Sequence, residues 1–326
     1  MAENTPGKAH RVGISLKQLM RMFPDDDASR QWIEAQIWPQ GPYCPHCGSF
    51  NVQCGIKHRT MTHRCRDCPN RPQFSLKTGT VMQGTKLGYR DWAIAIYLLT
   101  TNLKGVAAMK LHRDLEITYK SAWHLAHRLR KAFAGGETPM FHGPAEADET
   151  YFGGKRKNMS NAKRKALEGR GAIGKAAVAG VKDRETGRVA ARRMERTDAT
   201  ALQGFVRENV QPGATLYTDE AAAYRGMPEF EHEVVNHSAK EFVREVAHTN
   251  GVESFWSMLK RGYQGTFHKF SEKHLDRYVG EFAGRHNIRN ADTIDQMAII
   301  ARQTVGKRLR YRELIADNGL PSGARS

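Results

Sequence analysis

Two pairs of closely spaced cysteines most constrain what this chain can fold into. Cys44-Pro-His-Cys47 is followed, after 17 intervening residues, by Cys65-Arg-Asp-Cys68. Two cysteines three positions apart on a tight knuckle can both point at one ion, and two such knuckles complete a tetrahedron of thiolates. Gly48 follows the first pair, where a turn needs a permissive backbone. The spacing therefore predicts a Zn²⁺ site formed by Cys44, Cys47, Cys65 and Cys68.

A site closed by four sulfurs has no open coordination position, so this zinc is expected to be structural rather than catalytic. The alternative is four unrelated buried thiols. The fifth cysteine, Cys54, is expected to be an ordinary thiol, and His58 and His63 are weaker substitute ligands because neither has a matching partner. Paired cysteines in a chain of 326 residues do not resemble a secreted disulfide framework, and the N-terminus lacks an apolar leader segment. A reducing, cytoplasmic compartment is expected.

The charge balance indicates a polyanionic partner. The chain has 51 Lys and Arg residues against 34 Asp and Glu residues, which gives a formal net charge of +17. Nucleic acid and an anionic membrane both satisfy that charge. The best apolar run, residues 93–99, is far shorter than the roughly 20 residues that a membrane-spanning helix needs. Nucleic acid is therefore the expected partner, and no membrane association is expected.

Changes in composition along the chain predict five segments. Periodicity and cap residues predict two short helices within residues 14–37, broken near Pro24. Apolar spacings of three and four predict helices over residues 89–134. The expected segments are an N-terminal helical segment (1–40), a zinc ribbon (41–80), a helix-turn-helix-like segment (86–136), a catalytic domain (140–290) and a C-terminal helical tail (291–326).

The segment from about residue 141 to 290 has the pattern of an α/β domain. Short apolar runs at residues 172–181, 188–194 and 214–218 are candidate strands. Helices are expected at residues 198–209, with Asp198 or Thr200 as cap, and at residues 249–261, which end at the Gly262 stop. Strands followed by helices in this way are typical of α/β architecture.

Residues 105–133 suit a helix-turn-helix, with a turn at residues 115–118 and a second helix from Lys120 to Phe133. An apolar set on the second helix is expected to face inward. The remaining polar set is expected to face phosphates or base edges. The alternative is a helical hairpin that only packs the domain together. The inward set is Trp123, Leu125, Leu129 and Phe133, and the outward set is Lys120, His124, His127, Arg128, Arg130 and Lys131.

Acidic residues in apolar strand contexts stand out in so basic a chain. Asp148 lies in the run 145–154, and Asp219 ends the apolar run 216–219. A carboxylate at a buried strand end is costly unless it is paired or holds a cation. A third acid, Glu253, lies on the predicted helix from residue 249, three positions after Asn250. Any one of these acids taken alone has the ordinary alternative of a surface carboxylate.

Two carboxylates on strands and an acid from a following helix can hold a pair of Mg²⁺ or Mn²⁺ ions about 4 Å apart. Such a pair supports phosphodiester cleavage and strand transfer by in-line displacement. Lys260 follows Glu253 by seven positions, about two helical turns, and shares its face. Glu149 is the alternative to Asp148, because a one-residue slip in strand register would exchange them.

A basic stretch beside the first aspartate is expected to bind DNA phosphates. Residues 151–175 carry eight basic residues against one acid, Glu168. The alternative is a surface insertion without a binding role. The basic residues are Lys155, Arg156, Lys157, Lys163, Arg164, Lys165, Arg170 and Lys175.

The combined motifs resemble the DDE transposases of prokaryotic insertion sequences, in the group that carries an N-terminal zinc ribbon. The resemblance runs from about Phe23 to about Asn290. Its blocks are Trp38-Pro39-x-Gly41 leading into Cys44, Asp148-Glu149-Thr150-Tyr151 with Gly153-Gly154-Lys155, Thr218-Asp219 with Tyr224, and His248-Thr249-Asn250 with Glu253, Phe255-Trp256, Leu259-Lys260-Arg261-Gly262, Gly265-Thr266-x-His268 and Glu281-Phe282.

This resemblance implies a ribonuclease H-like mixed-sheet catalytic domain and divalent-metal chemistry at element ends. Asp148 and Asp219 would be the two aspartates, and Lys260 would contact a substrate phosphate. The third position is acid or amide in this group. Glu253 is favoured because a carboxylate is the better ligand and because Lys260 follows it on the same helical face, and Asn250 comes second. The implied partners are double-stranded DNA, as terminal inverted repeats and target DNA, and further copies of the chain in a dimer or larger complex.

Two other functional classes remain open from the sequence. A zinc-ribbon and helix-turn-helix regulator without catalysis explains the charge but leaves the acidic trio without a purpose. A ribonuclease H-like nuclease explains the acids, and only the combination with a zinc ribbon favours transposition over it.

Overall fold

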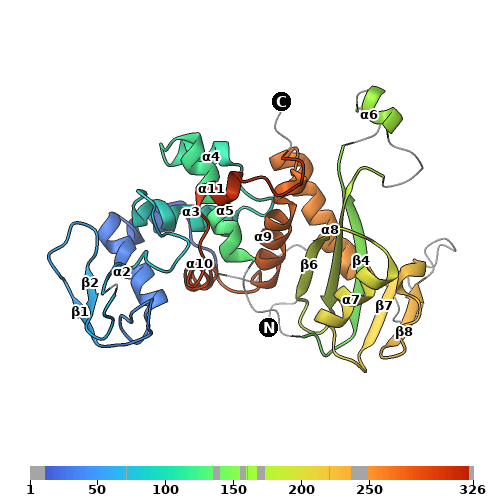
Figure 1. The fold of residues 1–326 in the computed structure, drawn as a ribbon, viewed down its shortest axis with the longest axis horizontal. Helices are drawn as coiled ribbons and strands as arrows, with labels where there is room; N and C mark the ends of the chain where they lie inside the picture. Colours follow the sequence, from blue (N-terminus) through green and yellow to red (C-terminus); the bar gives the residue numbers. More distant parts are fainter. Residues whose placement is uncertain are drawn as a thin grey trace. The chain divides into compact units, whose positions relative to one another are not determined.

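The structure is a computed structural model that describes residues 12–70, 72–134, 140–154, 159, 161–166, 173–219, 221–235 and 249–322. The chain divides into two compact units (Figure 1). Unit 1 comprises Met1–Gly135 and Ile288–Ala316, and unit 2 comprises Gly136–Asn287 and Asp317–Ser326. Within the described ranges, no helix combines the length and apolar character required to cross a membrane.

Unit 1 begins with two short helices, α1 (Leu16–Met22) and α2 (Asp26–Ile37). The Ser15 hydroxyl accepts from the Gln18 amide in a capping box that starts α1, and the Asp25 carboxylate accepts from the Ala28 amide at 2.8 Å to start α2. The predicted break near Pro24 is therefore confirmed. These helices bury Leu19 and Ile33 in the core of the unit.

The cysteine-rich segment forms a small antiparallel sheet of three strands, β1 (Val52–Cys54), β2 (His63–Cys65) and β3 (Gln73–Phe74). Its hydrophobic side is continuous with the core of unit 1, because Cys44, Cys65 and Phe74 are all fully buried there. A ribbon this small buries little apolar area of its own, so a bound metal would add to its stability.

Three further helices follow, α3 (Tyr89–Thr101), α4 (Ala108–Asp114) and α5 (Tyr119–Phe133). Thr118 caps α5 by accepting from the Ser121 amide. The predicted helix pair with its turn at 115–118 is confirmed. The chain returns to this unit with α10 (Thr293–Gln303) and α11 (Tyr311–Ile315), so the expected separate tail instead supplies Met297 and Ile300 to the core of unit 1.

Unit 2 contains a mixed five-stranded sheet in the order β6-β5-β4-β7-β8 (Figure 1). Strand β5 runs antiparallel to its neighbours β4 and β6, and β7 and β8 continue the sheet in parallel with β4. This arrangement confirms the predicted α/β class and the ribonuclease H-like mixed sheet. The strands are β4 (Ala145–Phe152), β5 (Ala176–Asp183), β6 (Val189–Met194), β7 (Thr215–Asp219) and β8 (Glu231–Val235).

Helices cover both faces of this sheet and divide its core in two. One face packs with α7 through Ala145, Ala147, Phe205 and other apolar side chains. The opposite face packs with α8 and α9 through a second cluster that includes Trp256. The helical elements of the unit are α6 (Asn161–Ala166), α7 (Ala199–Asn209), η2 (Ala222–Tyr224), α8 (Asn250–Gly262), η3 (Tyr263–Phe267), η4 (Glu272–His274) and α9 (Leu275–Asn287).

Candidate active site and metal centre

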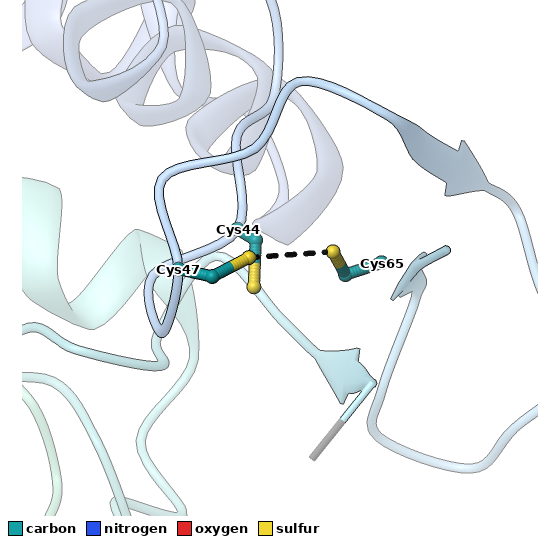
Figure 2. Close-up of side chains that lie close together, drawn as sticks. All are labelled: Cys44, Cys47 and Cys65. Carbon is teal, nitrogen blue, oxygen red and sulfur yellow. Dashed lines mark hydrogen bonds between the residues drawn. The ribbon is translucent and has the colours of Figure 1, made fainter. Parts of the chain in front are cut away.

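Three of the four predicted zinc ligands lie together in unit 1. The sulfur atoms of Cys44, Cys47 and Cys65 all lie within 4.8 Å of one another (Figure 2). The Cys47 and Cys65 sulfurs are 3.6 Å apart. The knuckle at Cys44 is closed by backbone hydrogen bonds, because the Gly48 amide donates to the Cys44 carbonyl at 2.9 Å. A soft set of three sulfurs at this spacing suits Zn²⁺.

The fourth predicted ligand, Cys68, is half-buried and lies outside that group of three. Cys68 follows β2 on the second knuckle. Because its sulfur lies outside the group of three, its role as the fourth ligand of a tetrahedral site stays a prediction. The weaker candidate ligand His63 and the fifth cysteine, Cys54, lie in surroundings that do not suit a zinc site. His63 is buried, stacks on Phe74 and has its pKa lowered chiefly by burial. Its ring therefore packs in the core, whereas Cys54 is exposed.

In unit 2 the two predicted aspartates lie on neighbouring strands and on the same face of the sheet. The parallel pairing of β4 with β7 places Ala147 beside Thr218, so the next residues along, Asp148 and Asp219, are also neighbours. Side chains alternate along a strand, and paired residues of parallel strands share a face. Ala147 belongs to the core on the α7 side. Asp148 and Asp219 therefore belong to the opposite face, where α8 packs.

The electrostatics of this pair indicate a place for positive charge. The pKa of Asp148 is raised to about 7, chiefly by burial and in addition by the neighbouring Glu149 and Asp219 carboxylates. Three carboxylates close together in a partly desolvated site repel one another. A divalent cation relieves that repulsion, and its oxygen ligands would be Asp148 and Asp219. The donor set thus fits Mg²⁺ or Mn²⁺ rather than Zn²⁺.

The register of β4 assigns Glu149 to the other side of the sheet. Its carboxylate accepts a hydrogen bond from the Tyr224 hydroxyl at 3.0 Å, in the layer formed by α7 and η2. Burial is the main cause that raises the pKa of Glu149. Eight residue pairs align β4 with β5 along its whole length, which fixes the register. The sequence left Asp148 and Glu149 as alternatives, and this geometry favours Asp148.

A tryptophan on α8 fixes the orientation of Asp148. The Trp256 indole N–H donates to the Asp148 carboxylate at 2.9 Å. The ring lies directly over Gly180, the β5 residue that pairs with Asp148, and a Cβ atom built at Gly180 would lie 2.6 Å from that ring. Glycine at this position lets the indole approach the sheet closely.

The other predicted residues of α8 share a helical row with Trp256. Glu253 precedes Trp256 by three positions and Lys260 follows it by four, so all three lie along one side of the helix. Asn250, Glu253 and Lys260 are exposed. The Glu253 carboxylate accepts from the Thr249 hydroxyl at 3.0 Å. Among the described residues, Asp148, Asp219 and Glu253 do not form a group whose carboxylate oxygens all lie within 4.8 Å of one another.

Glu146, which the sequence analysis did not assign to the site, attaches α8 to the sheet. This residue is 1% exposed and lies two positions before Asp148, hence on the same face. Its carboxylate accepts from the Val252 amide in the first turn of α8 at 2.8 Å and from Arg184 at 2.8 Å. Lys182 donates to the Gly251 carbonyl at 3.1 Å. Alternation along β4 is the sequence feature that pairs Glu146 with Asp148.

Gly251→Ala is expected to separate α8 from β4. A Cβ atom at residue 251 would lie 2.6 Å from one carboxylate oxygen of Glu146 and 3.0 Å from the Lys182 ammonium. We expect a loss of about 1–3 kcal/mol in the free energy of unfolding, together with weaker Mn²⁺ binding. Urea denaturation and Mn²⁺ titration measure the two effects. Gly204→Ala on α7 is the matched control, because nothing lies within 4 Å of its added methyl group; equal stability of the two variants would contradict the attachment.

The raised pKa of Asp148 predicts a pH-dependent stability difference. Folding raises this pKa from 3.8 to about 7, so the folded protein binds the proton more tightly, and the resulting stability is lost as pH rises from about 4 to about 7. Without added divalent cations, Asp148→Asn should therefore be more stable than the natural protein at pH 8, by roughly 4 kcal/mol. The advantage should shrink toward pH 4. Urea denaturation across this pH range measures it, and a constant difference would contradict the burial of this carboxylate.

The basic residues predicted to contact DNA divide into four groups. Arg164 and Lys165 are exposed on α6. Lys131 donates to the Arg308 carbonyl at 2.8 Å. The expectation that Arg128 and Arg130 face DNA from the helix surface is wrong, because they are 7% and 1% exposed. The apolar row of α5 was read correctly, but the C-terminal segment of the chain covers part of its polar side. Lys155, Arg156, Lys157 and the side chain of Lys163 lie outside the described residues.

Comparison with known proteins gives two family matches and one relative. Residues 140–287 match the ISXO2-like transposase domain, and residues 24–71 match the transposase zinc-ribbon domain. A protein of Halobacterium salinarum, described as an uncharacterized protein in transposable element ISH50, is 28% identical over 269 residues, which cover 78% of this chain and 88% of that protein. The first family match contains both aspartates and α8, and the second contains all four predicted zinc ligands.

Proposed function

The chain belongs to the insertion-sequence transposases that carry a zinc ribbon ahead of an ISXO2-like transposase domain, and we propose on that premise that it cleaves DNA at element ends and joins the ends to target DNA. Asp148 and Asp219 would hold the catalytic cations. The observation that carries this proposal is the placement of these two carboxylates side by side on the face of the sheet that α8 covers.

Each residue of the site has a distinct task in the proposed reaction. Bound Mg²⁺ or Mn²⁺ would supply activation of a water or 3′-hydroxyl nucleophile and stabilisation of the leaving oxygen. Trp256 holds one oxygen of Asp148 and leaves the other for a ligand bond. Glu146 and Lys182 hold the start of α8 against the sheet. Lys260, exposed on the same row of α8, would bind a phosphate of the substrate.

The third metal-binding residue is proposed to be Glu253, with Asn250 as the alternative. Glu253 offers a carboxylate, the stronger ligand for Mg²⁺, and shares the helical row of Trp256 and Lys260. Its side chain is exposed and binds the Thr249 hydroxyl without a cation present. Release of the Thr249 hydroxyl would free this carboxylate to bind the cation.

The proposed substrates are the terminal inverted repeats of the element and a target duplex. The net charge of +17 and the exposed basic residues Arg164 and Lys165 on α6 support a DNA partner. A dimer or larger assembly is proposed for the DNA complex, because two element ends must be brought together for joining. Structural Zn²⁺ in the ribbon would belong to the DNA-binding part, and the protein would act on DNA in the cytoplasm.

Incubation of the purified protein with a duplex that carries the flanking inverted repeat, in Mg²⁺, tests the proposed function. A transposase releases a 3′-hydroxyl at the repeat boundary and joins it to a second duplex. Cleavage without joining would favour the nuclease alternative, and specific binding without cleavage would favour the regulator.

A further inference from the structure

A basic cavity in unit 1 lies apart from the cysteine cluster and from the aspartates. It has a volume of about 400 Å³ and is bounded by residues 83–87, by α5 and by residues 308–311. Four of its lining residues are cationic, and no carboxylate is among the described residues that line it. The cationic residues are Lys86, Arg128, Arg308 and Arg310.

One side of α5 builds this cavity by holding a distant part of the backbone. His124, Arg128 and Lys131 follow one another at spacings of four and three, so they form one row of the helix. His124 and Arg128 both contact the Leu309 carbonyl, at 3.0 and 3.2 Å, and Lys131 donates to the Arg308 carbonyl. Polar side chains that were expected to contact DNA directly therefore fix the segment that carries Arg308 and Arg310.

The buried positive charge of Arg128 has no carboxylate partner among the described residues in the lining of the cavity. Arg128 is 7% exposed and donates to the carbonyls of Gln83 and Leu309, but among the described residues no carboxylate pairs with it. Burial and the neighbouring Arg308 lower the pKa of Arg128. Arg310 has a carboxylate partner, because Glu313 lies 3.5 Å from its Nε. A buried guanidinium next to a second one is costly unless an anion joins them.

A hydrogen-bond donor without a partner among the described residues lies in the wall of the cavity. Trp92 is 0% exposed and lines the cavity, and its indole nitrogen has no hydrogen-bond partner among the described residues. Unsatisfied buried donors are rare in folded proteins. An oxyanion with several acceptor oxygens would offset the excess charge of Arg128 and Arg308.

We propose that this cavity binds a backbone phosphate of duplex DNA and so anchors unit 1 on the element, independently of base sequence. The choice of DNA over other anions rests on the proposed function. The exposed Arg308 and Lys86 line the cavity together with the buried Arg128. Their positive charges are therefore spread over an area that can bind more than one anionic group. A polyanion with closely spaced phosphates matches that spread better than a single free ion.

The test compares DNA binding by the double variant Arg308→Gln/Arg310→Gln with that by the natural protein. The probe is a duplex of about three helical turns and arbitrary sequence, titrated over a range of NaCl concentrations. We expect affinity at low salt to fall about tenfold and the slope of log affinity against log salt to fall by about 1 for each lost phosphate contact. Lys86→Gln, on the opposite wall, should lower the slope by about 1 without altering the arginines.

Arg302→Gln is the matched control, because Arg302 is exposed on α10 of the same unit and does not line the cavity. Circular dichroism and thermal melting confirm that each variant is folded. If the cavity variants behave like Arg302→Gln while the natural protein binds DNA, the cavity assignment fails and the proposed function stands. If the natural protein binds no duplex, the proposed function fails as well. If inorganic phosphate stabilises the natural protein but not the double variant, while DNA binding is unchanged, the cavity takes a free anion and the duplex assignment is wrong.

Discussion

Asp219→Asn should abolish strand cleavage in Mg²⁺ while element-end binding stays within about twofold. Asparagine keeps the size of the side chain and can still accept from the Ala221 amide, which Asp219 Oδ1 does at 3.1 Å. It lacks the negative charge that a divalent cation requires. We expect cleavage to slow by at least about 10²–10³-fold, the scale seen when one electrostatic element of an active site is removed. Gel assays of a labelled inverted-repeat duplex measure cleavage and binding on the same preparation.

Glu149→Gln is the matched control for this experiment. Glu149 is also an acid on β4, next to Asp148 in sequence, but it faces Tyr224 on the other side of the sheet. Glutamine can still accept from the Tyr224 hydroxyl, so this variant should retain most of its cleavage activity. Full cleavage by Asp219→Asn would exclude the metal-based account. Loss of cleavage in Glu149→Gln, with activity left in Asp148→Asn, would show that the active site lies on the α7 face of the sheet and not on the α8 face.

Removal of zinc should unfold the ribbon at residues 41–80 and weaken DNA binding about tenfold or more, the effect of losing about 1.4 kcal/mol of contact energy. Cys44 and Cys65 are 0% and 1% exposed and pack in the core of unit 1, so metal loss disrupts more than an exposed loop. In a small ribbon the free energy of metal binding is largely folding free energy. Hydrogen exchange locates the unfolding, and filter binding measures DNA affinity before and after chelation.

Cys65→Ser should reproduce the effect of the chelator, and Cys54→Ser should not. Cys54 is exposed and lies outside the cluster, so its variant controls for loss of a thiol. Cys68→Ser decides whether the fourth predicted ligand belongs to the site. Purified protein that contains no zinc by elemental analysis and keeps its ribbon folded would contradict the metal centre.

Local sequence patterns predicted much of the fold because the relevant interactions are local. Asp198 caps α7 by accepting from the Ala201 amide at 2.9 Å, and the predicted helix 198–209 matches Ala199–Asn209. Strand β8 was missed because Glu231–Val235 includes three polar residues, and only pairing with β7 makes it a strand. The role of residues 293–303 in the core of unit 1 was equally invisible, since it depends on contacts distant in sequence.

Site residues could be predicted from the sequence where the type of side chain is unusual for its local context. Asp148 and Asp219 stood out as acids in apolar strand contexts, and strand pairing then placed them side by side. Glu146 was not distinguished, because its partners Arg184 and Val252 come from other parts of the chain. Arg128 was assigned to the surface for the same reason, since the carbonyl of Leu309 that covers it is 181 positions away. Periodicity shows which side of a helix is polar but not what covers that side.

The most direct measurement of the central claim is an anomalous difference map from crystals grown with Mn²⁺. Our account predicts a peak between the carboxylates of Asp148 and Asp219 on the face of the sheet that α8 covers, with Glu253 or Asn250 as a further ligand. The same map then decides between those two residues. A fully occupied Mn²⁺ elsewhere in the molecule, with no density between the two aspartates, would contradict the proposed active site.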